Sequence, residues 1–132
     1  MPEIRVLIVD DQPLYRGVLA DLLEVVGGYQ VVGSAGTGEE AVELAARAAL
    51  DLVFMDLRLP GMDGLAATSL IRAAPHPPAV VLMSTDLDAL GREAVRESGA
   101  VDSRAKADLD PEWLSELRTR ISGEPSGSPI PR

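Results

Sequence analysis

The chain has 132 residues, enough for one hydrophobic core but not for two. It has no cysteine, which excludes disulfides, thiolate metal sites and a cysteine nucleophile, and suits a reducing cytoplasm. The net charge of −9 argues against direct nucleic-acid binding by this chain. We expect no signal peptide and no membrane span, because the apolar runs fall far short of the ~20 residues that a span needs.

The first expected strand is Ile4 to Val9, a continuous apolar run that is typical of a strand buried on both faces. A helix should begin at Pro13, since proline fits a first helical turn, and end at Gly27 and Gly28. Four apolar residues in it recur near helical spacing: Leu14, Val18, Leu22 and Val25.

Tyr29 to Ala35 resembles a second, weaker strand. Thr37 and Glu40 fit a capping box, which predicts a helix that runs to about Ala48. A third buried strand is expected from Leu52 to Met55 and is closed by an aspartate.

Residues 59–64 contain a proline and two glycines and should form a loop. A helix is expected over 65–73, before three prolines, followed by a fourth strand over 79–83. The next helix should cover 87–97 and end at Gly99.

Val101 to Ala105 should be the fifth strand by its position, although it carries an aspartate, a serine and an arginine. The last helix should follow Asp110 and Pro111, with four residues on one face: Trp113, Leu114, Leu117 and Ile121. We expect one domain over residues 1–122, with 123–132 as a disordered tail or an interdomain linker, because that stretch holds three prolines and two glycines.

Strands and helices thus alternate five times, which predicts an α/β fold with a doubly wound parallel sheet. Ligands of such sheets bind beyond the carboxyl ends of the strands. The polar residues at these ends are Asp10, Asp11, Asp56, Ser84, Thr85 and Lys106. Taken singly, each has an ordinary explanation as a turn former, a helix cap or a solvated surface group.

Together, these residues predict a site for a cation and a phosphoryl group. Three converging carboxylates would raise each other's pKa unless a cation joined them, and hard oxygen ligands suit Mg²⁺. A lysine ammonium can pair with a phosphoryl group, and a serine or threonine hydroxyl can donate a hydrogen bond to it.

The chain resembles bacterial two-component response-regulator receiver domains over roughly residues 4–121. The resemblance rests on V-D-D after the first strand, M-D-L-R-L-P-G-M-D-G around Asp56, M-S-T at the fourth strand, and S-G-A seven residues before Lys106. It implies a flavodoxin-like (βα)5 fold with strand order 2-1-3-4-5. The first half is most similar to receivers of LuxR-type (NarL/FixJ-like) DNA-binding regulators.

The resemblance also implies roles for single residues. Asp56 would be the phosphoacceptor, with Ser84 and Lys106 engaging the phosphoryl group. The Mg²⁺ ligands would be Asp10, Asp11, Asp56 and the backbone carbonyl of Arg58.

The chain departs from the family at its switch. Ser103 stands where the family usually has an aromatic residue that reports phosphorylation. Thr85, Arg58 and Asp86 border the acceptor, and Arg58 and Asp86 could pair across its mouth or remain two solvated side chains.

The leading hypothesis is a phosphoacceptor switch, not an enzyme that turns over an external substrate. The resemblance implies a sensor histidine kinase as donor, a possible homodimer, and a helix-turn-helix output domain absent from these residues. A degenerate receiver that acts as a phosphorylation-independent interaction module is the alternative. A phosphatase with an aspartyl-phosphate intermediate is disfavoured, because Arg58 stands where its general acid-base aspartate would be.

Overall fold

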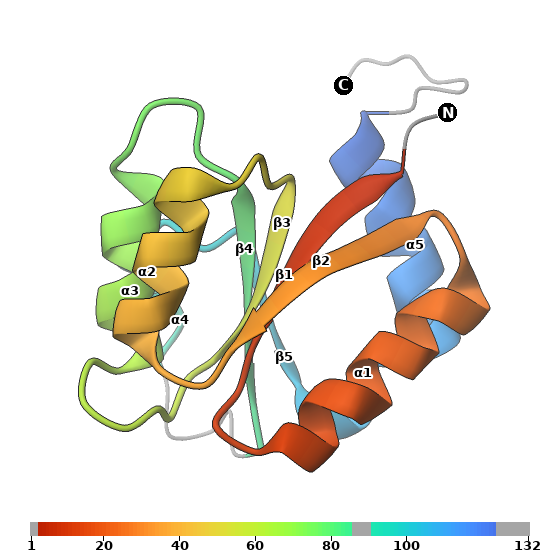
Figure 1. Ribbon diagram of the computed structural model, residues 1–132, viewed down its shortest axis with the longest axis horizontal. Coiled ribbons are helices and arrows are strands. Elements are labelled where there is room, and N and C mark those ends of the chain that lie inside the picture. Colours follow the sequence, from red (N-terminus) through yellow and green to blue (C-terminus); the bar gives the residue numbers. More distant parts are fainter. Residues whose placement is uncertain (1–2, 86–90, 124–132) are drawn as a thin grey trace.

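The computed structural model describes residues 3–85 and 91–123, which form a five-stranded parallel sheet covered by helices (Figure 1). The strand order β2-β1-β3-β4-β5 confirms the predicted doubly wound topology. The strands are β1 (Ile4–Val9), β2 (Tyr29–Ala35), β3 (Leu52–Asp56), β4 (Ala79–Ser84) and β5 (Asp102–Ala105). The helices are α1 (Pro13–Val26), α2 (Gly38–Arg47), α3 (Gly64–Arg72), α4 (Arg92–Ser98) and α5 (Pro111–Ser122), with a 3₁₀ turn, η2 (Lys106–Asp108), before the last.

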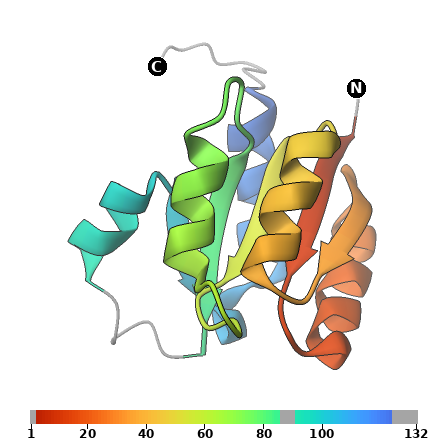
Figure 2. The same cartoon turned by 60° about the vertical axis from the view of Figure 1, so that its left-hand side comes forward.

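Two hydrophobic cores lie on the two faces of the sheet. Helices α1 and α5 cover one face and α2, α3 and α4 lie on the other (Figures 1 and 2). Leu19, Leu23 and Leu114 are buried in the first core, and Ala67 and Ile71 in the second. Every residue of β3 is buried, as expected for a central strand whose two faces are both covered by helices.

The helix starts follow the predicted chemistry. Pro13 and Pro111 occupy the first turns of α1 and α5. The Thr37 side chain accepts a hydrogen bond from the Glu40 backbone N–H at 3.1 Å and caps α2. The side chain of Asp63 caps α3 in the same way.

Helix α1 is where predicted, but three of the four apolar residues noted for their helical spacing are exposed, whereas Leu22 packs against the core. Leu14, Val18 and Val25 are 82%, 53% and 79% exposed. The residues that α1 buries fully are Leu19 and Leu23. The helix therefore carries a second apolar stripe that faces away from the core.

Helix α4 is shorter in the described part of the chain than its predicted range. Gly91 has extended backbone angles and precedes the first helical residue, Arg92. Residues 87–90 of the predicted helix lie outside the described residues, as does Asp86.

The polar segment predicted as the fifth strand does join the sheet, as the edge strand β5. Helix α5 and the turn before it provide partners for its charged side chains. Asp102 pairs with Arg120 at 3.1 Å, and the Arg104 guanidinium lies 5.0 Å from the centre of the Trp113 ring. An edge strand with such partners tolerates charged residues that a central strand would not.

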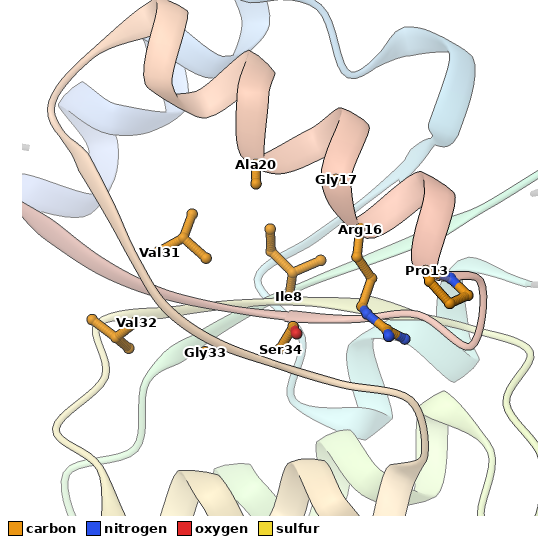
Figure 3. A pocket seen from close by; sticks show the side chains of 9 residues that line it. All are labelled: Ile8, Pro13, Arg16, Gly17, Ala20, Val31, Val32, Gly33 and Ser34. Carbon is orange, nitrogen blue, oxygen red and sulfur yellow. The ribbon is translucent and has the colours of Figure 1, made fainter.

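A shallow groove separates α1 from the other edge strand, β2 (Figure 3). The side chains of Ile8, Ala20 and Val31 point into it, and its walls include Gly17 and Gly33, which contribute no side chain. The pairing of β1 with β2 shifts register between Val6 and Leu7. Small residues and this irregular pairing leave the groove unfilled.

None of the helices within residues 3–85 and 91–123 is long and apolar enough to cross a lipid bilayer.

Candidate functional site

The register of the sheet brings the predicted site residues together. Val9 pairs with Met55, Asp56 pairs with Met83, and Ser84 pairs with Ala105. Asp10, Asp56, Ser84 and Lys106 consequently lie near the carboxyl ends of β1, β3, β4 and β5. Parallel strands end at one edge, so four distant segments contribute to one site.

Three carboxylates form the acidic part of the site. Asp10 and Asp56 are buried, at 0% and 5% exposure, whereas Asp11 is exposed. One oxygen from each carboxylate can be chosen so that all three lie within 4.8 Å of one another. The Asp10 side chain is held in place by Oδ1, which accepts a hydrogen bond from the Gln12 N–H at 2.9 Å.

Lys106 supplies the positive charge. Its Nζ lies 2.6 Å from Asp10 Oδ2 and 3.4 Å from Asp56 Oδ2, so it is nearer to Asp10 than to the expected phosphoacceptor. Asp10 Oδ2 is buried, and the Lys106 ammonium is its close partner among the described residues. A buried carboxylate oxygen with a lone pair to spare, beside two further carboxylates, fits a hard divalent cation such as Mg²⁺.

The electrostatics of Asp56 are set by burial. Burial and the nearby Asp10 raise the pKa of the Asp56 carboxyl, against the opposing effects of Lys106 and the Arg58 N–H. Burial acts to lower the pKa of Lys106, but Asp10 and Asp56 outweigh it and the pKa is raised. The ammonium therefore stays charged beside Asp56.

The remaining predicted residues lie at different distances from this centre. The Arg58 backbone N–H donates to Asp56 Oδ1 at 3.2 Å, so this residue lies against the acceptor, while its carbonyl as a metal ligand stays a prediction. Ser84 is buried at the end of β4, and Thr85 after it is exposed. The predicted pairing of Arg58 with Asp86 involves a residue outside the described part of the chain.

Ser103 lines a groove of about 320 Å³ between α4 and β5, whose lining includes none of the three clustered carboxylates. The groove also contains two arginines, Arg92 and Arg96. A serine leaves open the space that a larger side chain at this position would occupy.

Two features near Asp56 went unnoticed in the sequence. Gly64 begins α3 so close to β3 that a Cβ there would overlap the carbonyl oxygen of Asp56. Tyr15, in the first turn of α1, places its ring 4.6 Å from Lys106 Nζ. The only sequence signal for Tyr15 was an aromatic residue one helical turn after the acidic pair.

Known proteins share this fold and this arrangement of segments. Residues 6–117 match the family model of the response regulator receiver domain. The chain is 34% identical over 122 residues to the transcriptional regulatory protein LiaR of Bacillus subtilis, covering 92% of this chain and 58% of that relative. It is 42% identical over 109 residues to protein-glutamate methylesterase/protein-glutamine glutaminase 2 of Carboxydothermus hydrogenoformans, covering 82% of this chain and 31% of that relative.

A solved structure extends the comparison to the site. The receiver domain of the sensor histidine kinase PA1611 from Pseudomonas aeruginosa superposes with a TM-score of 0.80 at 29% identity, covering 92% of this chain and 99% of that one. That structure has a magnesium ion coordinated in its active-site cleft. The chain spans little more than half of LiaR and about a third of the methylesterase, so it matches one domain of each. The chain belongs to the response regulator receiver domains of two-component systems.

Proposed function

We propose that this chain is a phosphoacceptor switch in which Asp56 takes a phosphoryl group. The observation that carries the proposal is the contact of one ammonium, that of Lys106, with both Asp10 and Asp56 inside a three-carboxylate cluster. A structural ion pair would need one carboxylate, whereas a cluster with excess negative charge is suited to a cation and a phosphoryl group.

In phosphoryl transfer the protein contributes mainly by positioning the reactants and neutralising charge. A carboxylate oxygen of Asp56 attacks phosphorus, an acyl phosphate bond forms, and the bond from phosphorus to the donor breaks. The electron pair stays on the donor, which is an imidazole nitrogen when the donor is a phosphohistidine. Lys106 lies within reach of the phosphoryl oxygens. We expect the Ser84 hydroxyl to donate a hydrogen bond to one of them.

The residues that would hold Mg²⁺ are Asp10, Asp11 and Asp56, with the Arg58 carbonyl as the expected fourth ligand. When bound, the ion neutralises part of the charge on the phosphoryl oxygens.

We infer that the donor is a sensor histidine kinase of the cytoplasm. A protein donor must cover the rim of the site to bring its phosphohistidine to Asp56. Leu14 and Val18 of α1 come three and seven residues after Asp11 and are exposed and apolar, so we expect them to be suited to docking a protein donor. The alternative is a small-molecule donor, which needs no such surface.

We further propose that residues 1–122 are the receiver and that 123–132 join it to an output domain in a longer protein. The relative LiaR, of which this chain covers 58%, is named a transcriptional regulator. A helix-turn-helix output and control of transcription are therefore favoured, and a homodimer is the expected active form.

Phosphorylation is tested by incubating the chain with acetyl phosphate and Mg²⁺ and measuring its intact mass after an acid quench. We expect an added mass of one phosphoryl group. This added mass should be absent when a chelator removes Mg²⁺ before the reaction, and absent in Asp56→Asn. Asp51→Asn is the matched control, because this exposed carboxylate lies at the opposite end of β3. No added mass, or mass that persists in Asp56→Asn, would refute the proposal.

A degenerate receiver, an interaction module that is never phosphorylated, is the second candidate. The open groove at Ser103 favours it, since the aromatic form of the switch cannot operate there. An unphosphorylated chain that still binds its partner with full affinity would establish this reading.

A further inference from the structure

Tyr15 lies at the junction of the site and the core. It is the third residue of α1 and is half-buried, packed against the core on the α1 and α5 face of the sheet. Helix α1 begins three residues after Asp10, and this places the ring beside the end of β1.

The ammonium of Lys106 has three contacts of different kinds. It lies 2.6 Å from Asp10 Oδ2, 3.4 Å from Asp56 Oδ2 and 4.6 Å from the centre of the Tyr15 ring. A ring centroid within about 6 Å of an ammonium is attractive, and more so where water is excluded. The Lys106 side chain is only 12% exposed, so the contact is largely desolvated.

Two of these three contacts must change when the site works. On the proposed function, Asp10 becomes a cation ligand and Asp56 becomes an acyl phosphate, so neither carboxylate can hold the ammonium as it does now. The ring takes part in neither change. Burial and the nearby Asp10 and Asp56 raise the pKa of Tyr15 to about 12, so the ring remains a neutral phenol throughout.

A lysine needs such a fixed contact more than an arginine would. Its charge is carried at the end of a flexible four-carbon chain, and ordering that chain costs entropy. A ring that keeps the ammonium near Asp56 removes part of that cost before the phosphoryl group arrives.

We infer that Tyr15 is a positioning residue for Lys106, holding its ammonium beside Asp56 by a cation–π contact while the two carboxylates change partners. The inference rests on the proposed function and assigns to the ring, rather than to the hydroxyl, a part in phosphoryl transfer.

The rate of phosphorylation tests the ring against simple core packing. Tyr15→Leu keeps an apolar side chain but no ring, and we expect the rate constant with acetyl phosphate to fall about fivefold. Tyr15→Phe should stay within about twofold, because phenylalanine keeps the ring face. Fluorinated phenylalanines at position 15 should lower the rate step by step, since fluorine weakens the attraction of the ring for a cation at nearly constant shape. Equal rates across the fluorinated series, or a phenylalanine variant as slow as the leucine variant, would overturn the inference.

A second measurement does not depend on phosphorylation. In the metal-free protein, the ring current of Tyr15 should shift the ε-methylene NMR signal of Lys106 upfield, and this shift should persist in Tyr15→Phe and vanish in Tyr15→Leu. If the parent chain takes no phosphoryl group, the proposed function fails while the NMR shift still reports the contact. If the chain is phosphorylated and Lys106 shows no ring-current shift, the positioning role fails alone.

Discussion

Asp56 carries its charge where burial and the neighbouring Asp10 both oppose it. Lys106 and the Arg58 N–H offset this only in part, because the pKa of Asp56 remains raised. A carboxylate whose charge is poorly compensated in the folded protein is stabilised more by a bound cation than a well-paired carboxylate would be. Such perturbed groups are common at functional sites. The negative charge of Asp56 is thus destabilised by its surroundings in the metal-free protein.

We expect Asp56→Asn to stabilise the metal-free protein at pH 7. A carboxyl with a higher pKa in the folded than in the unfolded chain costs stability as pH rises, and the whole cost is present above the folded pKa. The variant removes it, so its melting temperature should exceed that of the parent by a few degrees, roughly 3 °C for each kcal/mol. The gain should disappear as pH falls below 3.8, the ordinary pKa of an aspartate, where both chains are uncharged at this position.

Calorimetry from about pH 3 to pH 8 with a chelator present measures this difference. Asp21→Asn, at an exposed position of α1, should change the melting temperature little. A lower melting temperature for Asp56→Asn at pH 7 would show that the pairing with Lys106 outweighs burial.

Helices α3 and α1 differ in how tightly they pack against their surroundings at their glycines. The start of α3 is packed tightly against the end of β3, since a Cβ at Gly64 would also lie 2.9 Å from Leu57 Cα. The middle of α1 is loose, and a Cβ at Gly17 would have nothing within 4 Å. At its far end α1 is tied to α5, because the Arg118 guanidinium donates to the Gly27 carbonyl at 2.7 Å. A side chain can therefore be added at Gly17 of α1 but not at Gly64 of α3.

We expect Gly17→Ala to stabilise the protein by up to about 1 kcal/mol, because alanine has a higher helix propensity than glycine at an exposed position inside a helix. Gly64→Ala should destabilise it by more than about 2 kcal/mol, because backbone atoms that meet the new Cβ cannot move aside cheaply. It should also slow phosphorylation, since the strained atoms belong to Asp56 itself.

Urea unfolding followed by circular dichroism measures both free energies of unfolding. Each variant is the other's control, as both add one methyl group to a helical glycine. Equal effects of the two substitutions would contradict the packing described for α3.

At the scale of the whole molecule, the described residues close both cores. The last fully buried side chain in the described residues of α5 is Leu117, and Ile121 packs against the same core. The helix ends at Ser122, with Gly123 in the left-handed conformation at its cap. Among the described residues, the core contacts of α5 end at Ile121.

We therefore predict that a chain ending at Gly123 folds with an unchanged melting temperature, within about 1 °C, and accepts the phosphoryl group at the same rate. Calorimetry and the acetyl phosphate assay on the two lengths measure this. A chain ending at Glu116, which removes Leu117 from the core, should lose several kcal/mol. A large loss of stability in the chain that ends at Gly123 would show that the domain extends beyond residue 122.

The sequence by itself determined the α/β class, the strands and helices, and which polar residues end the strands. These follow from local signals: continuous apolar runs, proline and glycine at helix ends, and one capping threonine. The polarity of 101–105 obscured the fifth strand, because its partners, such as Arg120 and Trp113, come from a helix further along the chain.

Only the tertiary structure decided which stripe of α1 is buried, because Leu14, Val18 and Val25 have the same helical spacing as a buried face would. It also decided that Lys106 lies nearer to Asp10 than to Asp56 and that Tyr15 lies within reach of the ammonium. Such distances depend on the register of four strands and on how α1 packs against the sheet. Register and packing arise from contacts between residues far apart in the chain, which no local pattern encodes.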